Sequence, residues 1–196
     1  MKPRYCITPR TEMPAIDLER MHALRAQVFR TRLNWSVPVT AGLEVDQYDT
    51  AAASYMLMYN SVDELCGCWR ILPTTGNYML ADTFQDLLYG IPAPCDPRVF
   101  ELSRFAVATD RAQGYGFSSA ARAAFAEIVA WSLNAGVQEL VTVTTPAIER
   151  LLVHMGIDVR RYGPPGRVDN GMAVALRIFI SAKTMGAVFD RYRKTA

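Results

Sequence analysis

The stretch from Val99 to Gly116 limits most strongly what this chain can fold into, because a buried strand, two charged residues and a glycine turn follow one another there. Apolar, β-favouring residues mark the strand: Val99, Leu102, Phe105 and Val107. Glu101 and Arg104 interrupt this run, and a buried charge costs several kcal/mol unless it is paired and hydrogen-bonded. The two charges therefore indicate either a structural ion pair or a polar site cut into a sheet.

A glycine turn with the pattern R-x-x-G-x-G follows the strand, at Arg111, Gly114 and Gly116, and a helical spacing of apolar residues covers 117–133. Backbone N–H groups converge at such a turn, and the N-terminus of the next helix adds its positive dipole end, so the turn is suited to a phosphate. The pattern is neither a P-loop nor a full dinucleotide fingerprint. It resembles the pantetheine-phosphate turn of the GNAT acyltransferase superfamily.

Length and composition favour one ordinary globular domain over residues 1–196. The net charge of +2 is too small to indicate nucleic-acid binding, and no apolar run is long enough for a membrane span. The first residues lead into no signal-peptide core, so we expect a cytoplasmic protein. Two distant histidines and four cysteines without a C-x-x-C pattern argue against a zinc site, and we expect reduced core thiols.

Positive charge is concentrated in residues 145–196, where nine Lys or Arg stand against four acids, an excess of five charges. The basic residues are Arg150, Arg160, Arg161, Arg167, Arg177, Lys183, Arg191, Arg193 and Lys194. This excess is either a solvated basic face or a surface for an acidic protein partner.

The hydrophobic pattern predicts a mixed, mainly antiparallel sheet with helices on both faces, in the α/β (α+β) class. Strands are expected at 4–8, 55–60, 65–72, 99–107, 138–144, 158–162 and 173–180, with a surface loop at 163–166. Helices are expected at 18–33 with Asp17 as the N-cap, and at 79–89, 117–133, 147–154 and 183–193. Pro73 ends the second strand of the early hairpin.

A loop at 34–50 brings three acids into six positions: Glu44, Asp46 and Asp49. Carboxylates so close together repel one another unless a cation lies among them, although acid-rich loops are also found simply solvated. Three arginines are available from neighbouring elements: Arg25, Arg70 and Arg104. A positively charged ligand is the other candidate. Arg25 and Phe29 lie four residues apart on one helical face, which suits either a site or an arginine at the core edge.

The chain resembles the acyl-homoserine-lactone synthases, the LuxI-type autoinducer synthase family of bacterial quorum sensing. The resemblance covers most of the chain and rests on an ordered series of residues in the contexts RAQVF, LNW, EVDQYD, GCWRILP and ELSRF. The series is Arg25, Phe29, Trp35, Glu44, Asp46, Asp49, Arg70, Phe84, Glu101 and Arg104. It implies a GNAT-like three-layer sandwich whose sheet has a V-shaped split beside the central strand.

The resemblance also implies two substrates, S-adenosylmethionine and an acyl thioester, usually carried by acyl carrier protein. The amine is acylated, the methionine carboxylate then closes a lactone by attacking its own γ-carbon, and methylthioadenosine leaves. No metal and no separate cofactor are implied, because S-adenosylmethionine is itself a substrate. Acyl-CoA is the alternative donor, and the glycine turn cannot decide between them because pantetheine carries a phosphate in both.

Residue roles follow from the resemblance by position. S-adenosylmethionine is expected at Arg25, Phe29, Trp35, Glu44, Asp46, Asp49, Arg70, Phe84 and Arg104. Catalysis is expected to depend on Glu101, Asp46 and Arg104, with Glu101 as the base that deprotonates the substrate ammonium directly or through a water. The acyl chain and pantetheine are expected at Ser103, Phe105, Arg111, Gly114, Gly116, Thr142 and Thr144.

Two questions stay open at this level. A general GNAT N-acyltransferase using acyl-CoA and another amine is the second candidate function, and a non-catalytic binding module is the third. Acyl-chain length depends on residues whose facing the sequence does not fix: Met79, Leu102, Phe105, Met155 and Leu176. We expect a medium-chain acyl group, with tolerance of a 3-oxo group dependent on Thr142.

Overall fold

The computed structural model describes residues 3–108, 119–169 and 171–190. Eight strands form the main sheet in the order β1-β4-β5-β6-β7-β10-β8, with β9 paired to β10. Their bounds are β1 (Arg4–Pro9), β4 (Ser54–Tyr59), β5 (Leu65–Pro73), β6 (Val99–Val107), β7 (Glu139–Thr144), β8 (Val159–Arg161), β9 (Gly166–Val168) and β10 (Gly171–Phe179). A small separate hairpin, β2 (Val39–Thr40) and β3 (Leu43–Glu44), lies within the acid-rich loop.

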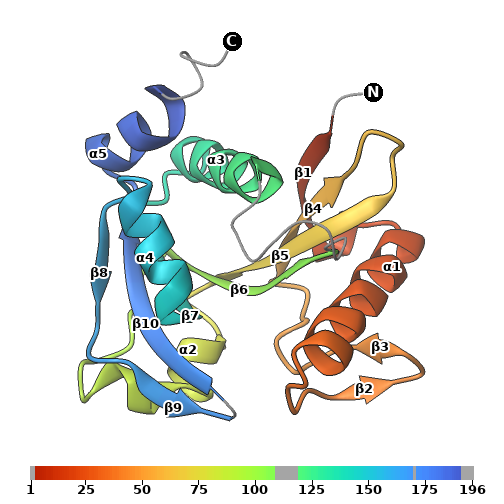
Figure 1. The fold of residues 1–196 in the computed structure, drawn as a ribbon, viewed down its shortest axis with the longest axis horizontal. Coiled ribbons are helices and arrows are strands. Elements are labelled where there is room, and N and C mark those ends of the chain that lie inside the picture. The colour runs from red at the N-terminus through yellow and green to blue at the C-terminus, as the bar shows by residue number, and fades with distance from the viewer. Residues whose placement is uncertain (1–2, 109–118, 170, 191–196) are drawn as a thin grey trace.

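Helices cover both faces of the sheet (Figure 1). Their bounds are η1 (Arg10–Glu12), α1 (Ala15–Arg25), η2 (Ala26–Arg32), α2 (Met79–Asp82), η3 (Gln85–Leu88), α3 (Ser119–Asn134), α4 (Pro146–His154), α5 (Ala182–Met185) and η4 (Gly186–Asp190). Residues of α1, η2, α2 and η3 pack into a first apolar cluster on one face, and residues of α3, α4 and η4 into a second cluster on the other. The predicted three-layer α/β architecture is confirmed.

The sheet splits between its two central strands. Strands β6 and β7 run parallel, whereas the other paired strands in the described part of this sheet are antiparallel. The register of β6 with β7 covers three pairs, from Val99 with Glu139 to Glu101 with Val141. Beyond Glu101 the two strands part, as Figure 1 shows where β6 continues beside β5. This is the V-shaped split that the family resemblance implied.

A β-bulge in β6 sets the direction of its side chains. Cys68 pairs with Ala106 and Arg70 with Ser103, so Trp69 faces two residues of β6. One of the two is Arg104, whose φ of +56° lies in the left-handed region that residues with a side chain rarely adopt. The bulge lets Ser103 and Arg104, which are neighbours in sequence, both reach the face on which α1 packs.

Three expectations about element ends are corrected. The first helix begins at Ala15 with Pro14 as its N-cap. Asp17 therefore lies in the first turn, where its negative charge interacts favourably with the helix dipole, but it does not cap the helix. The helix expected at 79–89 is two short pieces, because the backbone of Phe84 is not helical. The expected loop at 163–166 ends one residue early, since Gly166 already belongs to β9.

The glycine turn at Arg111, Gly114 and Gly116 lies outside the described residues, as does the end of the predicted C-terminal helix beyond residue 190. No helix in the described part of the chain is both long and apolar enough to cross a membrane.

Candidate active site

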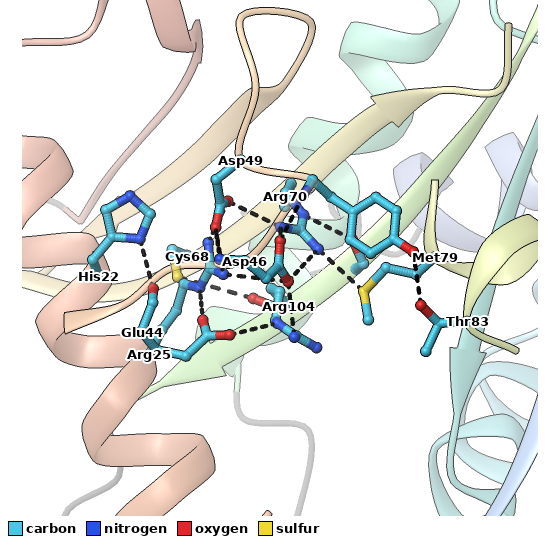
Figure 2. A network of polar contacts seen from close by, with 12 residues as sticks. His22, Arg25, Glu44, Asp46, Asp49, Cys68, Arg70, Met79, Thr83 and Arg104 are labelled. Atoms are coloured by element: carbon cyan, nitrogen blue, oxygen red, sulfur yellow. Dashed lines mark hydrogen bonds and ion pairs between the residues drawn. The ribbon is translucent and has the colours of Figure 1, made fainter. Parts of the chain in front are cut away.

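Three arginines and three carboxylates form one buried network between α1 and the middle of the sheet (Figure 2). The arginines come from α1, β5 and β6: Arg25, Arg70 and Arg104. The carboxylates all come from the acid-rich loop: Glu44, Asp46 and Asp49. Their side chains are between 0% and 11% exposed, and the six formal charges cancel. We call these six residues the ion network and the segment 44–49 the acid loop.

Arg25 is held on two sides. Its Nε donates to Glu44, and its Nη1 and Nη2 donate to the two carboxylate oxygens of Asp49 at 2.7 and 3.0 Å. Burial alone would raise the pKa of Asp49, but the hydrogen bonds and charge of Arg25, with help from Arg70, hold that pKa well below its usual range. Asp49 is therefore a carboxylate that stays ionised throughout the neutral range.

Arg70 is bound by two carboxylates, a hydroxyl and a sulfur. Its Nη1 donates to Asp49 at 2.9 Å, and its Nη2 donates to Asp46 at 3.1 Å. Its Nε donates to Ser103 Oγ at 3.1 Å, and Nη2 also contacts the sulfur of Met79 at 3.1 Å. Every nitrogen of this fully buried guanidinium is thus engaged.

Arg104 is the least enclosed arginine of the three. It makes one contact with each of two carboxylates, from Nε to Glu44 at 3.1 Å and from Nη2 to Asp46 at 2.8 Å, and its side chain is 11% exposed. Its guanidinium carbon lies 5.6 Å from the centre of the Phe29 ring. The Phe29 ring stacks in parallel on the Trp35 ring, with the ring centres 5.2 Å apart. The arrangement places a cation and two aromatic rings together at the edge of the network.

Two buried residues that the sequence analysis missed hold the acid loop in place. His22 Nδ1 donates to the backbone oxygen of Glu44 at 2.8 Å, and the Tyr55 hydroxyl donates to Asp49 at 2.7 Å. Burial, and then the charge of Arg25, lower the pKa of His22, so this ring stays neutral at pH 7. Their positions relative to the arginines could have indicated both residues. His22 lies one helical turn before Arg25, and Tyr55 is the strand residue paired with Arg70.

Glu101 lies at the point of the split, where the pairing of β6 with β7 ends. Its carboxylate accepts the backbone N–H of Leu80 at 2.7 Å and that of Met79 at 3.1 Å, at the start of α2. The side chain is buried, and burial raises the pKa of Glu101. Glu101 thus also has a structural role, since it anchors α2 to the sheet.

The residues expected to contact the acyl chain face both sides of the sheet. Alternation along β7 places Thr142 and Thr144 on the face of Leu140, which belongs to the second apolar cluster. Most of the expected chain-length residues belong to or pack against that cluster: Leu102, Phe105, Met155 and Leu176. Met79, the remaining chain-length residue, lies in the first cluster on the opposite face. Phe84, which was expected to contact S-adenosylmethionine, packs against that same cluster.

Within the described residues, no group of three His, Cys, Asp or Glu side chains is arranged to hold a metal ion. The carboxylates of the acid loop have arginines as their cations instead.

Comparison with known proteins identifies the family. The family model described as autoinducer synthase matches residues 10–188. An acyl-homoserine-lactone synthase of Pseudomonas aeruginosa is 45% identical over 174 residues, which cover 88% of this chain and 87% of that relative. The chain belongs to the autoinducer synthase family.

Solved structures agree with this assignment. The crystal structure of the AHL synthase LasI matches with a TM-score of 0.89 at 42% identity, over 96% of this chain and 95% of that one. TofI, solved in a ternary complex with an inhibitor and MTA, matches with a TM-score of 0.83 at 32% identity, over 96% of each chain. This autoinducer synthase is an acyltransferase that makes an N-acyl-homoserine lactone, and the resemblance drawn from the ten site positions is confirmed.

Asp49→Asn tests how far the protein depends on the ion network. The variant removes the carboxylate that Arg25 and Arg70 share and leaves only Glu44 and Asp46 to balance three buried arginines, so we expect the free energy of unfolding at pH 7 to fall by about 3–5 kcal/mol. Because the folded protein depresses the pKa of Asp49, this carboxylate contributes stability above its unfolded pKa of about 4, and the contribution is lost as the pH falls towards the folded value. The variant should therefore lose less stability than the wild type on acidification.

Urea unfolding at a series of pH values measures both effects. Asp63→Asn is the matched control, because Asp63 pairs with Arg4 at 2.9 Å on the surface, where both side chains are more than half exposed. The control should keep the wild-type profile. An Asp49→Asn variant as stable as the wild type would contradict the role given to the network.

Proposed function

We propose that this autoinducer synthase acylates the amine of S-adenosylmethionine with an acyl thioester and then closes the lactone, releasing methylthioadenosine. The observation that carries the proposal is the neutral ion network beside a buried carboxylate at the split of the sheet. The relative solved with MTA, the product that S-adenosylmethionine leaves behind, supports the choice of substrate.

The charges of the substrate match those of the network. Its sulfonium and ammonium groups are positive and suit the acid loop, whereas its carboxylate suits an arginine fork. Arg25 and Arg70 are fully buried and are each held by two carboxylates. Arg104 is more exposed and makes one contact with each of two carboxylates. We therefore assign to Arg104 the binding of the substrate carboxylate, which takes the place of a protein carboxylate.

Glu101 is proposed as the general base. An ammonium group cannot attack a thioester until it has lost a proton, and the Glu101 carboxylate takes this proton directly or through a water. The free amine attacks the thioester carbonyl, the amide forms and the pantetheine thiol leaves. The substrate carboxylate then attacks its own γ-carbon, which breaks the carbon–sulfur bond, and the electron pair of that bond stays on the sulfur of methylthioadenosine.

The test of the function is an incubation with S-adenosylmethionine and acyl donors, followed by detection of methylthioadenosine and acyl-homoserine lactone together. An acylated amine without methylthioadenosine would instead support an N-acyltransferase acting on another amine. Substrate binding without turnover would support a binding module.

Glu101→Gln tests the assignment of the base. We expect kcat to fall by about 10²–10⁴-fold, because a glutamine cannot accept the proton. Burial raises the pKa of Glu101, and the base acts when it is deprotonated, so the wild-type kcat/KM should rise with pH through that raised pKa while the variant loses this dependence.

The stability of Glu101→Gln must be measured as well. Glu101 accepts hydrogen bonds from two backbone N–H groups, and the glutamine NH2 group would face one of them, donor against donor. Glu64→Gln is the control at an exposed carboxylate, which accepts a hydrogen bond from Asn60 at 3.0 Å. If Glu101→Gln unfolds the protein while Asp46→Ala and Arg104→Ala stay fully active, the charges form a structural ion pair and the assignment is wrong.

Acyl carrier protein is the proposed donor, and we place the reaction in the cytoplasm, where both substrates are made. The basic C-terminal quarter supports an acidic partner, although part of its charge is neutralised within the fold. Arg161 pairs with Glu149 at 2.6 Å, and Arg177 pairs with Glu139 at 2.6 Å. Arg150 and Arg160 are exposed and form no ion pair with another described residue.

Charge reversal tests the donor. Arg150→Glu and Arg160→Glu should raise the KM for acyl carrier protein and its dependence on salt, while the KM for S-adenosylmethionine stays the same. Arg20→Glu is the matched control, because Arg20 is an exposed arginine on α1, on the opposite face of the sheet from α4. Equal or better turnover of acyl-CoA, insensitive to the reversals, would overturn the preference.

Thr142→Val tests the selection of the acyl chain. A hydroxyl that hydrogen-bonds a 3-oxo oxygen contributes roughly 0.5–1.5 kcal/mol, so its loss should lower the preference for 3-oxo donors several-fold. Turnover of matched 3-oxo-octanoyl and octanoyl donors by the wild type and the variant measures this ratio. An unchanged ratio would remove Thr142 from the specificity site.

A further inference from the structure

One pair of hydroxyl groups ties the acid loop to the segment that follows α2. The Tyr48 hydroxyl lies 2.7 Å from Thr83 Oγ1, at the contact drawn beside Thr83 in Figure 2. Among the described residues, this is the hydrogen bond that joins residues 44–49 to residues 79–84. The two segments are far apart in sequence and flank the ion network from different sides.

Tyr48 is fixed to the ion network at its backbone and at its ring. Its N–H donates to Asp46 Oδ1 at 2.9 Å, and Asp46 is bound by Arg70 and Arg104. The guanidinium carbon of Arg70 lies 5.6 Å from the centre of the Tyr48 ring, and the side chain is almost fully buried. The position of the Tyr48 hydroxyl is therefore set by the network.

Thr83 is fixed to α2, which ends at the preceding residue. Its N–H donates to the Met79 backbone oxygen at 2.7 Å, and the N–H of Phe84 donates to the same oxygen at 3.0 Å. Met79 is in turn bound by Glu101 through its N–H and by Arg70 through its sulfur. A bond that fixes Thr83 thus fixes the adjacent Phe84 relative to the acid loop.

We propose that Tyr48 is a positioning residue of the S-adenosylmethionine site, and that its hydroxyl bond to Thr83 holds Phe84 at a set distance from the acid loop. The proposal rests on the proposed function, which places the charged end of the substrate at the acid loop, and on the family resemblance, which implies that Phe84 contacts the same substrate. Thr83 is exposed, so water replaces the lost bond at this end when the tyrosine hydroxyl is removed. Loss of the bond therefore affects the spacing of the site more than the stability of the fold.

The variants Tyr48→Phe and Thr83→Val test this role. We expect each to raise the KM for S-adenosylmethionine by roughly three- to tenfold, the range of one neutral hydrogen bond, with the KM for the acyl donor and the melting temperature close to wild type. The double variant should be no worse than the more impaired single variant, because both remove the same bond. Calorimetric titration of S-adenosylmethionine gives an independent measure of the same loss.

Tyr78→Phe is the matched control, because Tyr78 is a buried tyrosine beside α2 whose hydroxyl donates to the Pro94 backbone oxygen at 2.5 Å, away from the acid loop. It should leave the KM for S-adenosylmethionine unchanged. With an active wild type, an unchanged KM in Tyr48→Phe, additive losses in the double variant, or an equal loss in Tyr78→Phe would overturn the role of Tyr48 and leave the function standing. A wild type that neither binds S-adenosylmethionine nor releases methylthioadenosine would overturn the proposed function itself.

Discussion

The fold around the active site depends on the burial of two arginines that keep their charge at every pH at which the protein is folded. Arg25 and Arg70 are completely enclosed, so carboxylates must be brought to them, and the acid loop supplies these. The acid loop begins at the end of the hairpin of two-residue strands β2 and β3 and contains no further helix or strand, so its course is set by these ion pairs together with the bonds from His22 and Tyr55. A buried ion pair adds little net stability over an apolar pair of the same volume, whereas removal of one partner is costly. The network therefore specifies one conformation of the loop more than it stabilises the protein.

Strand β6 connects this network to the rest of the site through its bulge. In a regular strand, successive side chains would alternate between the faces, and Ser103 and Arg104 could not both meet the network. The left-handed backbone at Arg104 removes that constraint, and its conformational cost is offset by the two carboxylates that Arg104 then reaches. Phe105 returns to the other face, where it packs on Trp69 with the ring centres 4.4 Å apart. One irregular residue thus allows a single strand to serve the polar site and the apolar core.

The sequence predicted the residues of the ion network and most strands because charges within apolar runs have few physical explanations. Arg70 and Glu101 interrupt buried strands, and three crowded acids need a cation, so these positions were found from local pattern alone. Features that depend on tertiary contact were not found in this way. The position of Met79 against Arg70, the bonds of Tyr48 and Tyr55, and the pairing of Arg177 with Glu139 join segments that no local pattern connects. That last pairing also lowers the charge excess counted from residues 145–196, because Glu139 lies outside that segment.

The two faces of the sheet divide the proposed reaction between them. The ion network lies with α1 and α2 on the face of the first apolar cluster, whereas Thr142 and most of the chain-length residues lie on the face of the second. A continuous sheet would keep an amine on one face away from a thioester on the other. The strands part beyond Glu101, so the carboxylate proposed as the base lies where the two faces meet. It follows that acyl-chain preference can change through Leu102, Met155 or Leu176 without disturbing the ion network, because these side chains pack on the opposite side of the sheet from it.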